Sequence, residues 1–118
     1  MTGVQTCALP IFGYREGALT SAVNLAALAT SAGATSIVCS PFEVSAIRQR
    51  VGSDTVLITP GVRPADSAAG DQKRATTPAE AIANGADYVV IGRPITSYAK
   101  ESLEAMTRRA SEISSSLL

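Results

Sequence analysis

The sequence predicts an α/β fold in which short apolar strands alternate with helices. Three apolar runs have the length and β-branched content of strands, and helical patterns precede the first run and follow each of them. This alternation predicts parallel strands joined by right-handed helical crossovers. The strands are expected within the runs SIVCS, TVLIT and DYVVIG.

The first helix is expected over residues 18–33, where ALTSAVNLAALATSAG is rich in alanine and leucine. Gly33 supplies its stop. The strand SIVCS follows and is expected to end near Ser40. The apolar residues of the helix recur at helical spacing, at Leu19, Val23, Ala26 and Ala27.

Two later helices are expected to begin with the same chemistry. SPFE from Ser40 and TPAE from Thr77 each place a hydroxyl at the N-cap, a proline at the first helical position and a glutamate three residues after the cap. Gly85 stops the second of these helices. A last helix is expected from about Ser97 to Ser114.

The runs TVLIT and DYVVIG are continuously apolar, which is typical of parallel strands buried on both faces. A complete α/β barrel needs eight strands and about 250 residues, and an open doubly wound sheet usually has five strands or more. Three strands are too few for either. The chain is therefore expected to be a piece of a larger fold.

The composition excludes several classes of protein. The chain has 118 residues, a net charge of zero and dispersed basic residues, which argues against a nucleic-acid surface. No apolar run reaches the roughly 18 residues of a membrane helix. The two cysteines lack metal-ligand spacing and are expected to be reduced intracellular thiols. Histidine is absent, so proton transfer would need Lys, Asp, Glu, Tyr or Cys.

The N-terminal residues MTGVQTCALPI resemble the translation of a sequencing-library adapter behind an initiator methionine. Residues 1–12 are therefore expected to be a non-native or disordered segment, and residues 13–118 to be the domain portion. The alternative is a genuine unstructured extension.

A long polar loop, TPGVRPADSAAGDQKR, follows the second strand, and GRPIT follows the third. Ligands of parallel α/β folds bind on such loops, and consecutive strands place their loops side by side. Gly92 permits close approach of main-chain N–H groups, and the helix start that follows adds positive partial charge. Arg93 offers a planar fork of donors for a phosphate. Arg63 and Gln72 offer further donors, so the combination predicts a phosphate site.

Each residue has a plainer interpretation when it is taken alone. Gly92 and Pro60 are typical of turns, and Arg93 or Gln72 is typical of a solvated surface. Cys39 is expected to be a buried thiol at the end of a strand, since no base accompanies it. Lys73 and Arg74 are expected to be solvated, or to pair with Asp66 and Asp71.

The motifs VCSPFE, LITPGVRP, GDQKR and TTPAEAIANGADYVVIGRPIT occur in this order between about Ala18 and Met106. In order and spacing they resemble the orotidine 5′-phosphate decarboxylase family. The resemblance implies a TIM (β/α)8 barrel, of which this chain would hold about strands six to eight with their helices. Those strands would lie at Ser36–Cys39, Val56–Thr59 and Tyr88–Ile91. It also implies a cytoplasmic, homodimeric lyase of pyrimidine nucleotide synthesis that converts orotidine 5′-phosphate to UMP and CO2 without metal or cofactor.

The resemblance assigns substrate contacts but no catalytic residue to this chain. Gln72, Arg93 and the Gly92 main chain would hold the phosphate, Arg63 would contact the substrate, and Pro60 and Val62 would line an apolar wall against the pyrimidine. The family's catalytic Asp-x-Lys-x-x-Asp stretch is missing, and neither Lys73 nor Lys100 matches it. The chain alone is expected to be inactive. Two alternatives are another phosphate-binding TIM-barrel lyase, such as a sugar-phosphate decarboxylase or aldolase, and a non-catalytic phosphate- or nucleotide-binding module.

Overall fold

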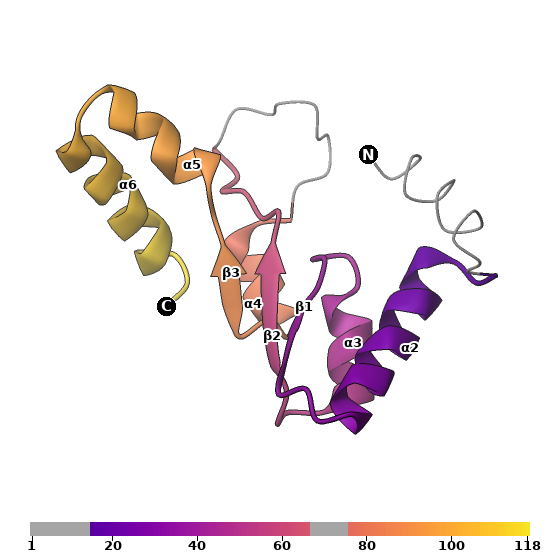
Figure 1. Cartoon of the computed structure of the whole chain (residues 1–118). Helices are drawn as coiled ribbons and strands as arrows, with labels where there is room; N and C mark the ends of the chain where they lie inside the picture. The colour runs from indigo at the N-terminus through magenta and orange to yellow at the C-terminus, as the bar shows by residue number, and fades with distance from the viewer. Residues whose placement is uncertain (1–14, 67–75) are drawn as a thin grey trace.

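A computed structural model describes residues 15–66 and 76–118 of the chain. Within these ranges helices and strands alternate as predicted, and three helical segments follow the last strand (Figure 1). The elements are α2 (Ala18–Ser31), β1 (Ser36–Val38), α3 (Val44–Val51), β2 (Val56–Pro60), α4 (Pro78–Ala83), β3 (Tyr88–Val90), α5 (Arg93–Thr96), the 3-10 helix η1 (Ser97–Lys100) and α6 (Leu103–Ser115).

The three strands form one parallel sheet in the order β1-β2-β3. Val38 of β1 lies opposite Ile58 of β2, and Pro60 of β2 lies opposite Val90 of β3. The predicted parallel pairing of consecutive strands is confirmed. The carboxyl ends of all three strands, and the loops that follow them, therefore meet at one edge of the sheet.

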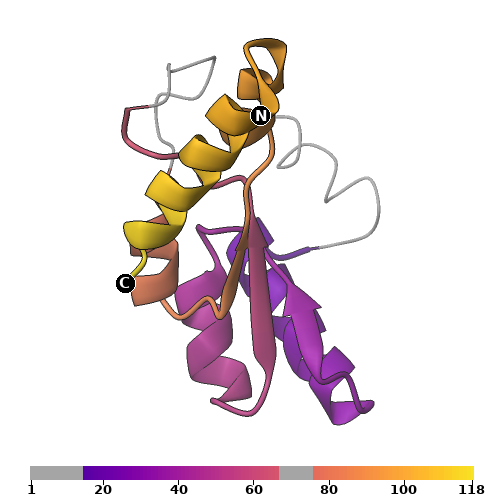
Figure 2. The same ribbon diagram turned by 90° about the vertical axis from the view of Figure 1, so that its left-hand side faces the viewer.

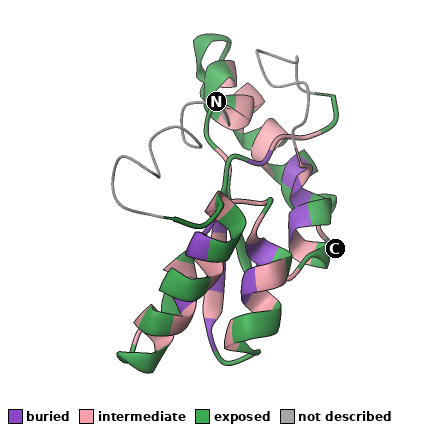
Figure 3. Ribbon diagram, turned by 90° about the vertical axis from the view of Figure 1, so that its right-hand side faces the viewer, coloured by how far each residue is buried: buried purple, intermediate pink, exposed green. Residues whose placement is uncertain are grey.

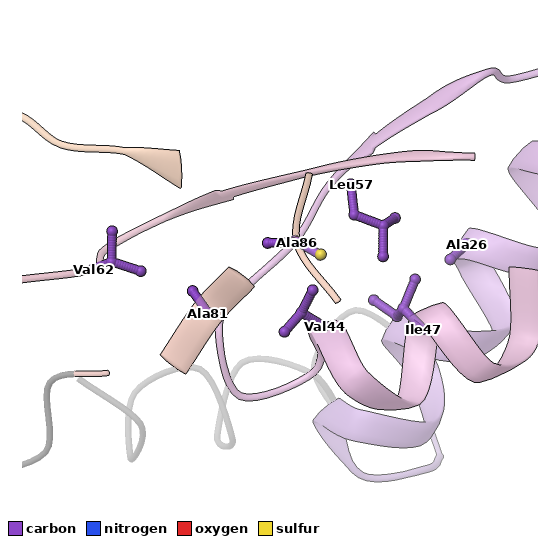
Figure 4. Close-up of a cluster of buried hydrophobic side chains, with 8 residues drawn as sticks. Ala26, Val44, Ile47, Leu57, Val62, Ala81 and Ala86 are labelled. Atoms are coloured by element: carbon purple, nitrogen blue, oxygen red, sulfur yellow. The ribbon is translucent and has the colours of Figure 1, made fainter. Parts of the chain in front are cut away.

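One face of the sheet packs against helices α2, α3 and α4. The buried cluster joins Ala26 of α2, Val44 and Ile47 of α3, Leu57 of β2 and Ala81 of α4 (Figure 4). Val44, Leu57 and Ala81 are fully buried. This cluster supplies most of the hydrophobic stabilisation of the described residues, because each fully buried aliphatic side chain contributes about 1.5–3 kcal/mol.

The other face of the sheet is largely open. Along β2, half-buried residues alternate with buried ones, and on the flanking strands Val38, Tyr88 and Val90 are 68%, 63% and 52% exposed. Burial is accordingly concentrated between the sheet and its helices (Figure 3). The prediction that the later strands are buried on both faces is wrong, because the described residues place a helical layer on one face alone.

The C-terminal helix lies apart from the main core. α6 packs mainly against α5 and η1, on the side of β3 away from α2 (Figures 1 and 2). The radius of gyration is 16.0 Å, whereas a compact domain of this length is expected near 13–14 Å. The chain therefore has an extended shape, with a core at one end and the α5–α6 unit at the other.

The two predicted capping boxes have different outcomes. At α4 the Thr77 hydroxyl accepts the Glu80 main-chain N–H at 3.2 Å, and the Glu80 carboxylate accepts the Thr77 N–H at 2.8 Å, so this prediction is confirmed. Before α3 the Ser40 hydroxyl instead accepts the Phe42 N–H at 3.1 Å, and the helix begins at Val44. The hydroxyl bonds two residues ahead rather than three, which makes a turn rather than a helix cap.

The predicted last helix is interrupted. Ser97–Lys100 form the 3-10 helix η1, and α6 begins afresh at Leu103. Ser102 adopts an extended conformation and its hydroxyl accepts the Ala105 N–H at 3.0 Å, so it caps a new helix. Among the described residues, no helix has both the length and the apolar character needed to cross a membrane.

Candidate functional site

The loops that follow β2 and β3 start side by side. Pro60 and Val90 are the last residues of their strands and lie opposite each other in the register. Arg63 and Arg93 each come three residues after this pair. The register therefore places the starts of the two predicted ligand-binding loops at the same edge of the sheet, as expected of neighbouring parallel strands.

Gly92 and Arg93 form the start of the loop after β3. The Gly92 carbonyl accepts the N–H groups of Ile95 at 2.9 Å and Thr96 at 3.0 Å, so helix α5 begins at Arg93. A Cβ at Gly92 would meet no heavy atom within 4 Å, which leaves room for a ligand to approach the main chain. Arg93 is exposed, and within residues 15–66 and 76–118 its guanidinium has no hydrogen-bond or ion-pair partner.

The start of the loop after β2 is tied back at two points. Val62 packs into the hydrophobic core with 2% of its surface exposed. The main-chain N–H of Arg63 donates to the Thr76 carbonyl at 3.1 Å and closes the base of the loop. Pro60 is exposed, so of the two predicted wall residues only Pro60 presents its side chain at the surface. The half-buried Arg63 side chain has no partner in the described part of the chain.

The rest of this loop carries Gln72, Lys73 and Arg74, which lie outside the described residues. Asp66 is described, and its partner was not anticipated. The Arg109 guanidinium of α6 donates to the two Asp66 carboxylate oxygens at 2.6 and 3.0 Å. These bonds hold the pKa of Asp66 below its usual value. The two residues are 43 positions apart in the sequence, so no local spacing pointed to the pair.

Cys39 follows β1 and lies in the core, as predicted. It is 8% exposed and its sulfur lies 4.0 Å from the Thr59 hydroxyl oxygen. Burial raises the pKa of the thiol, and the Thr59 hydroxyl offsets part of that rise. A protonated, buried thiol is a poor nucleophile. Cys39 therefore packs the end of the strand and brings no reactive group to the loops.

Arg48 of α3 joins the connections at the opposite end of the sheet, where strands β2 and β3 begin. Its guanidinium donates to the carbonyls of Gly52 and Thr55, both at 2.7 Å, and to the Gly85 carbonyl at 2.8 and 3.0 Å. It also forms an ion pair with Asp87. The Asp87 carboxylate accepts the Leu57 N–H at 2.7 Å, and this bond, followed by the bonds from Arg48, lowers the pKa of Asp87.

The network around Arg48 lies at the amino ends of the strands, away from the candidate site. Nε and both terminal nitrogens of its guanidinium donate to acceptors within the protein. In parallel α/β folds that edge contributes stability, while ligands bind at the carboxyl edge. Sequence reasoning missed Arg48, because its carbonyl acceptors lie on the main chain of two separate connections, α3–β2 and α4–β3. We assign it a structural role.

The described residues of the candidate site have the charge expected of an anion-binding site, and none of them is a nucleophile or a general base placed for covalent chemistry. Two guanidinium groups without partners in the described residues stand on neighbouring loops, beside an open glycine backbone. Such an arrangement suits a phosphate, which guanidinium forks bind with charge-assisted hydrogen bonds. Among the described residues, no cluster of three potential metal ligands is present.

The fold and the candidate site define a class: a parallel α/β protein with two arginines on the loops at the carboxyl ends of neighbouring strands. A sequence model of the family described as "Orotidine 5'-phosphate decarboxylase / HUMPS family" matches residues 13–108. The chain belongs to this family. The family is a TIM barrel, and the three-stranded parallel sheet is consistent with part of one.

Curated relatives agree with this assignment. The chain is 52% identical over 96 residues to "Orotidine 5'-phosphate decarboxylase" of Thermobifida fusca, covering 81% of this chain and 41% of the relative. It is 48% identical over 113 residues to the protein of the same name from Paramagnetospirillum magneticum, covering 96% of this chain and 48% of the relative. The chain thus spans less than half the length of these relatives.

Solved structures show the same fold. The crystal structure of orotidine 5'-phosphate decarboxylase from Lactobacillus acidophilus superposes with a TM-score of 0.63 at 32% identity, covering 84% of this chain and 39% of that one. An uncharacterized conserved protein from Geobacillus kaustophilus gives a TM-score of 0.64 at 25% identity, covering 88% and 39%. The family resemblance predicted from the sequence motifs is confirmed.

Proposed function

We propose that the chain is the C-terminal portion, about strands six to eight, of an orotidine 5′-phosphate decarboxylase barrel. The reaction would release CO2 from orotidine 5′-phosphate and leave UMP. The observation that carries the proposal is family membership over residues 13–108, combined with the two guanidiniums at the carboxyl edge of the sheet. The share of each relative that the chain covers supports a partial barrel.

In this proposal the chain binds the phosphate end of the substrate. Arg93 and the Gly92 main chain hold the phosphate from the loop after β3, and Arg63 approaches from the loop after β2. Gln72, in the part of that loop outside the described residues, adds a donor. Pro60 faces the pyrimidine, while the burial of Val62 favours a supporting role for its side chain over direct contact.

The chain supplies no acid or base for the chemical step. The Asp-x-Lys-x-x-Asp stretch of the family does not occur in the sequence, so the catalytic lysine and aspartates would come from the portion of the barrel that precedes these strands. The chain alone would then be inactive. The proposed reaction needs no metal or cofactor, and the homodimer and cytoplasmic location implied by the resemblance remain predictions.

Phosphate binding still contributes to the rate in such an enzyme. Binding energy from a group remote from the reacting bond stabilises the transition state when it positions the substrate and drives closure of the site. Each charge-assisted hydrogen bond contributes about 1.5–3 kcal/mol. Loss of two such bonds from Arg93 corresponds to a decrease of about 10²–10⁴-fold in kcat/KM, since 1.4 kcal/mol is tenfold.

The test is a chimeric enzyme in which residues 13–118 of this chain replace the matching part of the P. magneticum decarboxylase. We expect the chimera to decarboxylate orotidine 5′-phosphate and Arg93→Ala to lower kcat/KM by that factor. Arg50→Ala, an exposed arginine on α3, is the matched control and should have no effect. A chimera that binds UMP without decarboxylation would favour the binding module, and turnover of a sugar phosphate alone would favour the other lyase.

A further inference from the structure

Arg109 of α6 occupies a position that links the two candidate loops. Its side chain is 10% exposed, although it lies on the surface helix of an extended molecule. Its guanidinium donates to both oxygens of Asp66, three residues beyond Arg63. The same guanidinium lies 5.9 Å from the ring centre of Tyr98 in η1, five residues beyond Arg93. One side chain therefore touches the segments that carry both candidate phosphate-binding arginines.

The contacts of Arg109 leave it little capacity to bind a ligand itself. Besides Asp66, one terminal nitrogen donates to Glu112 at 3.2 Å on the same helix. Its Nε atom is buried and has no hydrogen-bond partner in the described part of the chain. The planar fork is thus turned toward the protein. Arg109 also lies one residue beyond the range that the family model matches, 13–108.

The carboxylate of Asp66 explains why a cation is needed at position 109. A carboxylate near a phosphate site repels the ligand and competes with it for neighbouring guanidiniums. The bidentate pair with Arg109 neutralises Asp66 and directs it toward α6. Together with the Arg63 N–H bond to Thr76, the pair fixes the main chain on either side of Arg63.

We propose that Arg109 is a positioning residue that holds the segment after β2 against the α5–α6 unit and thereby sets the relative placement of Arg63 and Arg93. The functional consequence rests on the proposed phosphate site. Arg109 acts through Asp66 and Tyr98 and does not touch the substrate. Helix α6 thus supports the proposed site through Arg109, which contacts Asp66 after β2 and Tyr98 after β3.

The first experiment uses this chain alone and needs no activity. Hydrogen exchange of the Arg63 amide, which is bonded to Thr76, is compared between wild type, Arg109→Ala and the control Arg108→Ala, an exposed neighbour on α6. The Cys39 amide, bonded to Ile58 in the sheet, is the internal reference. We expect Arg109→Ala to accelerate exchange at Arg63 at least tenfold with the reference unchanged. Equal protection of Arg63 in both variants overturns the proposal.

The second experiment uses the chimera and separates positioning from general stability. We expect Arg109→Ala to raise KM about tenfold with kcat changed by less than twofold, and Arg109→Lys to restore part of the affinity. Asp66→Ala should also raise KM, but no more than Arg109→Ala does, because it removes the pair without leaving an unneutralised carboxylate. The double variant should match Asp66→Ala, because the two residues act as one unit. Additive effects, or a KM equal to that of Arg108→Ala, refute the proposal.

The two proposals fail in different ways. Near-normal kinetics in Arg93→Ala would refute the proposed phosphate site. The amide exchange at Arg63 would still report whether the Arg109–Asp66 pair holds the segment after β2. A large loss in Arg93→Ala with no change in Arg109→Ala would keep the phosphate site and exclude the positioning role.

Discussion

Replacing Arg48 by alanine should destabilise the folded chain by about 3 kcal/mol. Arg48 donates to four acceptors: the carbonyls of Gly52, Thr55 and Gly85, and the Asp87 carboxylate. Water can replace it at Gly52 and Asp87, whose bonds are exposed. The bonds to Thr55 and Gly85 are partly buried.

The magnitude follows from the two partly buried carbonyls. Each buried acceptor left without a donor costs about 1–3 kcal/mol, so two give about 2–6 kcal/mol. Because both carbonyls are only partly buried, the lower half of that range, about 3 kcal/mol, is expected. Arg48→Lys keeps the charge but can reach fewer of the acceptors than the guanidinium fork, so it should recover less than half of the loss. The total stability of domains is about 5–15 kcal/mol, and such a loss is therefore measurable.

Urea unfolding followed by far-UV circular dichroism measures these differences. Arg50→Ala is the control, since Arg50 lies two positions along the same helix and is exposed. Its change should stay within about 0.5 kcal/mol, as for other surface substitutions. If Arg48→Ala and Arg50→Ala shift the midpoint equally, the network does not hold the amino edge of the sheet and the reasoning is refuted.

Three further predictions concern the core and its edges. Gly85→Ala should destabilise the chain more than Gly33→Ala. Both glycines have a positive φ (110° and 102°), but only a Cβ at Gly85 would lie 3.0 Å from Cβ and Cγ of Arg48. Thermal unfolding of the two variants measures the difference, and equal decreases in Tm would contradict the prediction. The folded-state pKa of Asp87 is lowered, so the stability that its carboxylate contributes is present above the usual pKa of 3.8 and is lost as the pH falls below that value. Asp87→Asn should weaken the acid dependence of the free energy of unfolding measured in urea. An unchanged slope of that free energy against pH would count against the prediction. In a Cys7→Ser background, iodoacetamide at pH 8 should alkylate Cys39 at least a hundredfold faster in urea than in buffer, and equal rates would show that the thiol is not protected.

The parts of the fold that depend on short-range chemistry were predictable. The capping box at Thr77 was predictable because its bonding groups lie within one turn of each other. The alternation of helices and strands gave the parallel sheet. Ser40 has the same local pattern as Thr77, yet its hydroxyl bonds the Phe42 amide, because a turn precedes α3. Local sequence does not distinguish these two uses of a serine or threonine hydroxyl.

The parts that depend on distant partners were not predictable. Asp66 was expected to pair within its own loop or to leave nearby cations solvated, but it pairs with Arg109 on the last helix. The acceptors of Arg48 are main-chain carbonyls, which every residue possesses and no motif marks. For the candidate site, the loops that follow the strands and the family resemblance predicted Arg63, Gly92 and Arg93, and the strand register places the starts of the two loops side by side.

The open face of the sheet, with Val38, Tyr88 and Val90 exposed, has a consequence for the life of the polypeptide in a cell. Chaperones and quality-control proteases select chains that display contiguous apolar surface and unpaired strand edges. The residence time of this chain would then depend on how quickly that face is covered after synthesis.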